Sequence, residues 1–121
     1  MYKICVKGNF SAAHFLRNYK GKCEKIHGHN WVVEVLVGSA KLREEMVMDF
    51  KDLKKTMGKT VSLLDHNFLN RIKYFKKVNP TSENIAKFIF TNIKKLLPKS
   101  VELLEVAVEE TPSNKAVYTG G

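Results

Sequence analysis

The chain has 121 residues and a formal net charge of +9 at pH 7, from 21 Lys+Arg and 12 Asp+Glu. This length predicts a single domain over residues 1–121, and a hydrophobic fraction of 44% excludes a disordered chain. No apolar run approaches the roughly 20 residues that span a bilayer, so we expect a cytoplasmic protein without a membrane partner.

The first predicted element is a strand over residues 2–14, where polar and apolar residues alternate. This alternation does not fit the apolar core of a signal peptide. Gly8 predicts a bulge or bend in the strand, and Cys5 is predicted to be a small buried hydrophobe. A polar loop is expected over residues 15–26.

The second predicted strand covers residues 27–37, with Trp31 and three valines on one face and His27 and His29 on that same face. Residues 46–48 indicate a short extended piece. Asp49 then predicts the N-cap of a helix over residues 50–61, which a loop over residues 64–70 follows.

Thr81 predicts the N-cap of a second helix, which we expect to run to about residue 97, before Pro98. Two strands follow, over residues 101–108 and 115–118. The order strand-strand-helix-helix-strand-strand predicts an α+β fold, a four-stranded antiparallel sheet with two helices on one face. We expect an oligomer, because the edges are open and we assign to the uncovered face the apolar side chains Val33, Val35, Val106 and Val108.

Three of the four histidines fall at adjacent strand ends. His27 and His29 point the same way in a strand, and His14 ends the strand that can pair with it. Three neutral imidazoles suit Zn²⁺ and leave a fourth position for water or substrate. The alternative is that these histidines are ordinary core residues.

Three further groups have open alternatives. Cys23 is either a fourth ligand of a closed zinc site or a low-pKa thiol acting as base or nucleophile. His66 follows Asp65 and is either a supported proton carrier or a turn residue. One of Glu109 and Glu110 should face the interior by alternation, where a guanidine-like ligand edge would pair with it; otherwise the pair is a solvated strand end.

Six stretches of the chain occur in the order seen in the 6-pyruvoyltetrahydropterin synthase family. They are residues 10–14 (FSAAH), 23–29 (CEKIHGH), 48–50 (MDF), 64–70 (LDHNFLN), 79–84 (NPTSEN) and 110–111 (ET). The chain therefore resembles this family over nearly its whole length. The family includes the prokaryotic 6-carboxytetrahydropterin synthases of the queuosine pathway, which the chain resembles most.

The resemblance implies the tunnelling fold, in which subunits close into a barrel, usually as a homohexamer made of a dimer of trimers. It also implies Zn²⁺ on His14, His27 and His29. The implied reaction converts 7,8-dihydroneopterin triphosphate to 6-carboxy-5,6,7,8-tetrahydropterin, acetaldehyde and triphosphate.

The resemblance further assigns roles to individual side chains. Cys23 would be the general base, and Asp65 with His66 a proton relay contributed across a subunit interface. Glu110 would anchor the 2-amino and N3 edge of the pterin, and Thr81 would help to line that pocket.

The product stays open because Glu24 directly follows Cys23. Family members with Glu here resemble a variant that cleaves the same substrate to 6-hydroxymethyl-7,8-dihydropterin for folate synthesis. Glu24 is therefore a second candidate base or merely a solvated loop carboxylate. Elimination to 6-pyruvoyltetrahydropterin is a third outcome.

The positive charge also invites a nucleic-acid-binding hypothesis, in which zinc is structural and four-coordinate. The lysines are scattered, however, in short pairs such as residues 54–55 and 76–77, and no base-reading module is present. We therefore expect no nucleic-acid partner. The charge fits a solvated surface or attraction of a triphosphate-bearing substrate.

Overall fold

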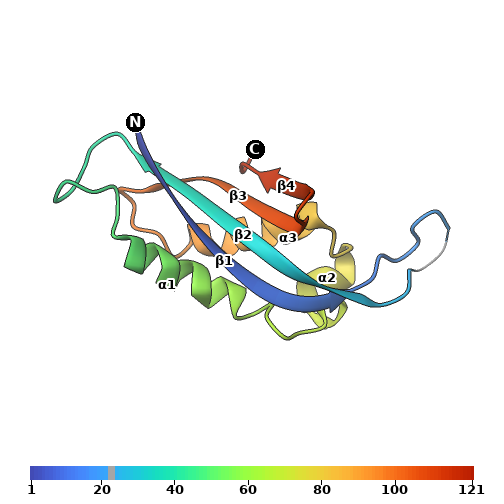
Figure 1. Cartoon of the computed structure of the whole chain (residues 1–121). Helices are drawn as coiled ribbons and strands as arrows, with labels where there is room; N and C mark the ends of the chain where they lie inside the picture. The colour runs from blue at the N-terminus through green and yellow to red at the C-terminus, as the bar shows by residue number, and fades with distance from the viewer. Residues whose placement is uncertain (22–23) are drawn as a thin grey trace.

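The computed structural model describes residues 1–21 and 24–121. One antiparallel sheet has the strand order β1-β2-β3-β4, in which each strand pairs with its neighbours along the chain. The strands are β1 (Tyr2–His14), β2 (His27–Ser39), β3 (Glu102–Thr111) and β4 (Asn114–Tyr118). The long helices α1 (Phe50–Val61) and α3 (Ser82–Lys94) pack against this sheet (Figure 1). The predicted α+β fold is confirmed.

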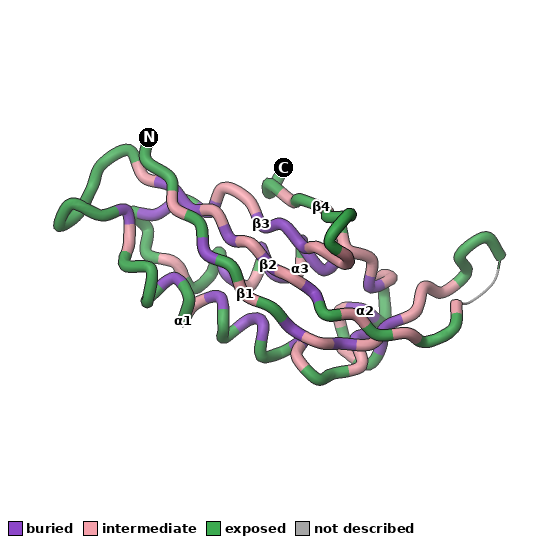
Figure 2. The backbone as a smooth tube through the Cα atoms, viewed as in Figure 1, coloured by how far each residue is buried: buried purple, intermediate pink, exposed green. Residues whose placement is uncertain are grey.

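The core lies between the helices and one face of the sheet. Trp31, Val33, Val35 and Val37 alternate along β2 and are completely buried. Burial therefore alternates along the strands in Figure 2, while the loops at both ends are exposed. His27 and His29 continue the same face of β2 beyond Trp31, so the core face leads directly into the histidine cluster.

One of the two reasons for which the sequence predicted an oligomer, an apolar uncovered face, is wrong. Val106 and Val108 pair with Val35 and Val33, and all four are buried in the helix-covered core of one chain. The opposite face is instead partly charged: Lys7 Nζ lies 3.4 Å from Glu34 Oε1. These apolar side chains belong to the core face and were assigned to the uncovered face, so the expectation of an oligomer keeps only the argument from the open edges of the sheet.

Two details predicted for β1 are also wrong. Of the bulge or bend predicted at Gly8, the bulge is absent, because the pairing of β1 with β2 shows no register shift. Gly8 instead allows helix α1 to pack closely against β1, because a Cβ at this position would lie 2.6 Å from Met57 Cε. Cys5 is exposed and not buried, because it points to the uncovered face of the sheet.

Both helix caps are confirmed: Asp49 Oδ1 accepts a hydrogen bond from Lys51 N at 2.8 Å, and Thr81 Oγ1 accepts one from Asn84 N at 3.1 Å. Helix α3 ends earlier than predicted, at Lys94. Residues 46–48 form no strand, and Met46 makes only an isolated bridge to Arg43.

Between the long helices, the last two residues of the loop expected over residues 64–70 begin a 3-10 turn, η1 (Leu69–Arg71). The short helix α2 (Lys73–Lys77) comes next. Leu69 and Phe75 are completely buried there, so this segment covers the end of the core next to the histidines. No helix within the described ranges is both long and apolar enough to cross a bilayer.

Candidate metal centre

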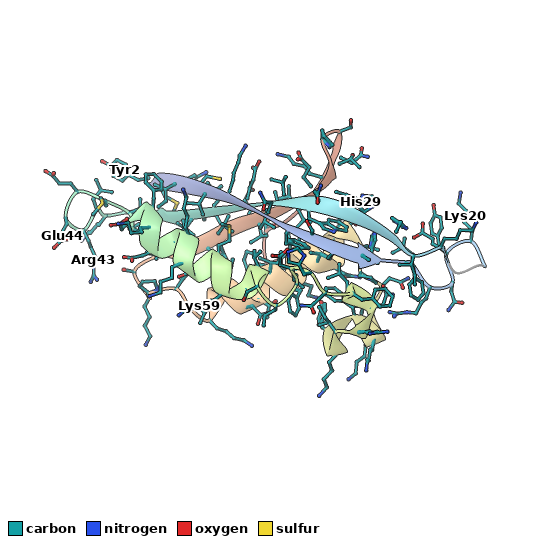
Figure 3. The ribbon with its side chains drawn as sticks, turned by 60° about the horizontal axis from the view of Figure 1, so that its bottom comes forward. Tyr2, Lys20, His29, Arg43, Glu44 and Lys59 are labelled. Atoms are coloured by element: carbon teal, nitrogen blue, oxygen red, sulfur yellow. The ribbon has the colours of Figure 1, made fainter. Side chains whose placement is uncertain are left out.

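Antiparallel pairing brings the three predicted histidines together. His14 at the end of β1 pairs directly with His27 at the start of β2, and Ala12 pairs with His29. The ring centroid of His14 lies 4.6 Å from that of His27 and 5.4 Å from that of His29. Figure 3 shows His29 on the sheet, on the side of the loop that carries Lys20 and away from Tyr2.

A carboxylate from the third strand completes the cluster. Glu110 Oε1 lies 2.8 Å from His29 Nε2 and 3.7 Å from His14 Nε2. One potential ligand atom from each of His14, His27, His29 and Glu110 lies within 4.8 Å of all the others. Of the two neighbouring glutamates, Glu110 is the one that faces this interior position.

Main-chain carbonyls set the orientation of two imidazoles. Nδ1 of His14 donates to the Pro80 carbonyl at 2.7 Å, and Nδ1 of His27 donates to the Lys25 carbonyl at 2.9 Å. A proton on Nδ1 leaves the lone pair of Nε2 free, which is the arrangement typical of metal-ligating histidines. Both rings therefore present Nε2 to the cluster.

The polar atoms of the cluster fit a bound cation. Within the described parts of the chain, the Nε2 atoms of His14 and His29 are buried and make no well-aligned hydrogen bond, although Glu110 Oε1 lies 2.8 Å from that of His29. Burial lowers the pKa of His14, against the effect of its hydrogen bond to Pro80. Converging imidazole nitrogens with an adjacent carboxylate are ligands that suit a divalent transition metal.

Trp31 forms the floor of the cluster. Its ring centroid lies 4.9 Å from that of His14 and 5.3 Å from that of His29, both edge-on. The indole Nε1 donates to the carbonyl of Ala12 at 3.2 Å, and the other side of the ring system stacks near Phe10. The imidazoles therefore rest on a rigid, completely buried aromatic side chain.

A cavity of about 250 Å³ adjoins the cluster. Its lining includes three polar residues at the start of α3, and Ser82 Oγ lies 3.5 Å from Glu110 Oε2. The remaining lining comes from the loop between β1 and β2 and from the cluster itself, namely Leu16, Tyr19, Glu24, His14, His27 and Glu110. A polar ligand edge in this cavity would meet the side chains at the N-terminus of α3 and the carboxylate of Glu110.

Asp65 and His66 are not part of this cluster of potential metal ligands. Asp65 Oδ1 accepts from Ser11 N at 2.9 Å, while His66 N donates to Ser11 O at 2.7 Å. The His66 imidazole is 82% exposed, and its Nε2 lies 3.6 Å from Asp65 Oδ2, beyond hydrogen-bonding distance. It lines a second cavity, of about 460 Å³, with Ser11 and Asn30.

The structure thus brings together four of the predicted site residues and holds Asp65 and His66 in a separate, exposed turn. Cys23 lies outside the described residues. Sequence reasoning missed the Pro80 carbonyl as a partner of His14. The Asn79-Pro80 pair before the helix cap at Thr81 indicates a turn in the sequence. Only the fold, however, shows that this turn lies against the end of β1.

Comparison with known proteins gives one consistent result. A family model described as 6-pyruvoyl tetrahydropterin synthase matches residues 3–121. A putative 6-carboxy-5,6,7,8-tetrahydropterin synthase of Archaeoglobus fulgidus is 43% identical over 108 residues, covering 88% of this chain and 86% of its own. A dihydroneopterin monophosphate aldolase of Pyrococcus furiosus is 38% identical over 108 residues, covering 89% of each chain. The solved structure of Caenorhabditis elegans 6-pyruvoyl tetrahydropterin synthase matches with a TM-score of 0.86 and 31% identity, over 99% of this chain and 96% of its own.

Proposed function

Because the chain belongs to the 6-pyruvoyl tetrahydropterin synthase family, we propose that it is a zinc-dependent pterin lyase acting on 7,8-dihydroneopterin triphosphate. The proposed products are 6-carboxy-5,6,7,8-tetrahydropterin, acetaldehyde and triphosphate, which would feed queuosine synthesis. The observation that carries the proposal is the cluster of His14, His27 and His29 beside a polar cavity. The 43% identity to the A. fulgidus relative favours the carboxy product.

His14, His27 and His29 would hold the zinc ion, since their nitrogens converge and those of His14 and His29 are buried without a well-aligned hydrogen bond. When bound, Zn²⁺ supplies Lewis-acid polarisation of the oxygens on the substrate's side chain. The hydrogen bonds from Nδ1 of His14 and His27 keep these rings oriented for that role.

Glu110 would anchor the pterin. Its carboxylate borders the cavity beside Ser82, and two parallel hydrogen bonds from the 2-amino group and N3–H would satisfy both oxygens. Its contact with His29 makes a metal-ligand role the alternative. The two roles differ in which binding event a Glu110 variant damages.

Cys23 would take a proton from the substrate, and His66, supported by Asp65, would return one. The exposed position of His66, which is not among the converging ligand atoms of the three-histidine cluster, supports its use by a neighbouring subunit. We therefore propose a homo-oligomer, a dimer of trimers closed into a barrel, whose sites combine residues of two chains.

The test is to incubate the zinc-loaded protein with 7,8-dihydroneopterin triphosphate and identify the products by mass. We expect 6-carboxytetrahydropterin together with acetaldehyde. Zinc-loaded protein that leaves the substrate unchanged would contradict the proposed activity as a whole.

Cleavage to 6-hydroxymethyl-7,8-dihydropterin is a second candidate, favoured by the aldolase relative and by the glutamate at position 24. Elimination to 6-pyruvoyltetrahydropterin is a third, favoured by the likeness to the C. elegans protein. Their products have different masses, so the same experiment separates all three.

A further inference from the structure

The main chain of the three residues that follow His14 is held by side chains from elsewhere in the chain. Asn70 makes two hydrogen bonds to the main chain of Phe15, through Oδ1 to N at 3.0 Å and through Nδ2 to O at 2.9 Å. Asn79 makes the same pair to Arg17, both at 2.9 Å. Each carboxamide thus pairs with both main-chain polar groups of one residue just beyond the end of β1.

Glu24 supplies the third pair, on the residue between them. The Leu16 N–H donates to Glu24 Oε1 at 3.0 Å, and the Glu24 N–H donates to the Leu16 carbonyl at 3.0 Å. All six main-chain polar groups of residues 15–17 are therefore partnered. The contacts of Glu24 join the two ends of the loop that separates His14 from His27.

This contact uses the carboxylate of Glu24 for structure. Glu24 lines the same cavity as His14, His27 and Glu110, so its place near the chemistry alone does not distinguish a base from a structural group. Its hydrogen bond to Leu16 gives the carboxylate a structural role, because an oxygen that accepts from a partly buried N–H stabilises that main chain. Moving the carboxylate to a substrate would leave the Leu16 N–H without its partner.

We propose that Glu24 is a positioning residue, whose side chain latches the neck of the loop after β1 onto Leu16. The latch holds the chain on both sides of the metal centre, three residues before His27 and two after His14. The proposal rests on the proposed function for its catalytic consequence, whereas the latch itself is measurable without substrate.

The test compares three substitutions of Glu24. Glu24→Gln keeps an acceptor oxygen at the same reach but removes basicity, and we expect kcat within about threefold of the parent and the same product. Glu24→Asp keeps basicity but shortens the side chain, and Glu24→Ala removes it. We expect both to lower kcat about tenfold or more, because displacement of a reacting group by about 1 Å costs on that order.

Amide hydrogen exchange supplies the readout that needs no turnover. The Leu16 amide should exchange about tenfold faster in Glu24→Ala than in the parent, and as slowly in Glu24→Gln as in the parent. Zinc affinity should be equal in all three variants. Glu102→Gln and Glu102→Ala, at an exposed glutamate at the start of β3, are the matched controls.

Equal loss of activity in Glu24→Gln and Glu24→Ala, with Glu24→Asp still active, would overturn the proposal in favour of a base. Full activity in Glu24→Ala, or unchanged Leu16 exchange, would overturn it as well. If the parent protein has no activity on dihydroneopterin triphosphate, the exchange rates still decide whether the latch exists.

Discussion

The His14 imidazole of the metal centre depends on a main-chain carbonyl that a distant residue holds in place. The Pro80 carbonyl that receives Nδ1–H of His14 belongs to a corner held by Asn79, whose side chain is bound to Arg17 and whose own carbonyl accepts from Asn84 Nδ2 at 2.8 Å. The orientation of His14 is therefore set through Asn79, although this side chain makes no direct contact with the ring.

Replacing Asn79 should weaken metal binding. In Asn79→Ala the Pro80 carbonyl loses its support, so we expect the zinc affinity to fall about 10- to 100-fold, as for other partners of metal-ligating histidines. Competition with a chelator measures it. Asn92→Ala is the matched control, because Asn92 Nδ2 bonds only to the Phe88 carbonyl within α3. Equal affinities in both variants would contradict this role of Asn79.

Glu110→Gln separates the two roles of that carboxylate. If Glu110 anchors the pterin, KM should rise about 10- to 100-fold, since a charge-assisted hydrogen bond is lost, while the bound zinc stays at one ion per chain. Loss of zinc would instead identify Glu110 as a ligand. Glu109→Gln is the control, because Glu109 lies on the opposite face of β3, paired with Val32.

At the scale of secondary structure, the sequence pattern predicted the features that depend only on residues close together in the chain. The caps Asp49 and Thr81 and the alternation in β2 were read correctly, because capping and pleat act within a few residues. Which side of the sheet the helices cover is a long-range outcome, and there Val33 and Val106 were misassigned. The carbonyl of Pro80 and the amides of Asn70 and Asn79 were missed for the same reason: their partners lie 55 to 66 residues away.

The end of the chain after β4 gives a stability prediction. Gly120 has φ +83°, and a Cβ there would lie 2.7 Å from Phe90 Cζ. Gly120→Ala should therefore lower the free energy of unfolding by about 1–2 kcal/mol, from the left-handed backbone alone. Gly121→Ala, where no atom lies within 4 Å of the added Cβ, should leave it unchanged. Denaturant unfolding of the two variants compares them, and equal midpoints would contradict the prediction.

For the whole molecule, the central question is whether one chain contains a complete site. Its own fold assembles His14, His27, His29 and Glu110, while His66 projects outward from a turn with φ +57° that is pinned to Ser11. A positive φ outside glycine is uncommon and is kept where the surroundings enforce it. This turn presents an imidazole to a partner at a fixed place.

Mixing two inactive variants tests the shared site. His27→Ala lacks a metal ligand and His66→Ala lacks the relay, so each should be inactive alone. Randomly assorted in one oligomer, about a quarter of the sites should carry both intact residues and regain activity. Coexpression of differently tagged chains followed by an activity assay measures this. No recovery in verified mixed oligomers would show that each chain uses its own His66.

The floor beneath the histidines has one more consequence. Trp31 is the only tryptophan of the chain, and its ring lies about 5 Å from two of the expected ligands. The fluorescence of Trp31 should therefore report whether the metal centre is occupied. Co²⁺ added to metal-free protein should quench the emission and saturate at one ion per chain, and His29→Ala should abolish that saturation. The chain can thus report on its centre without label or substrate.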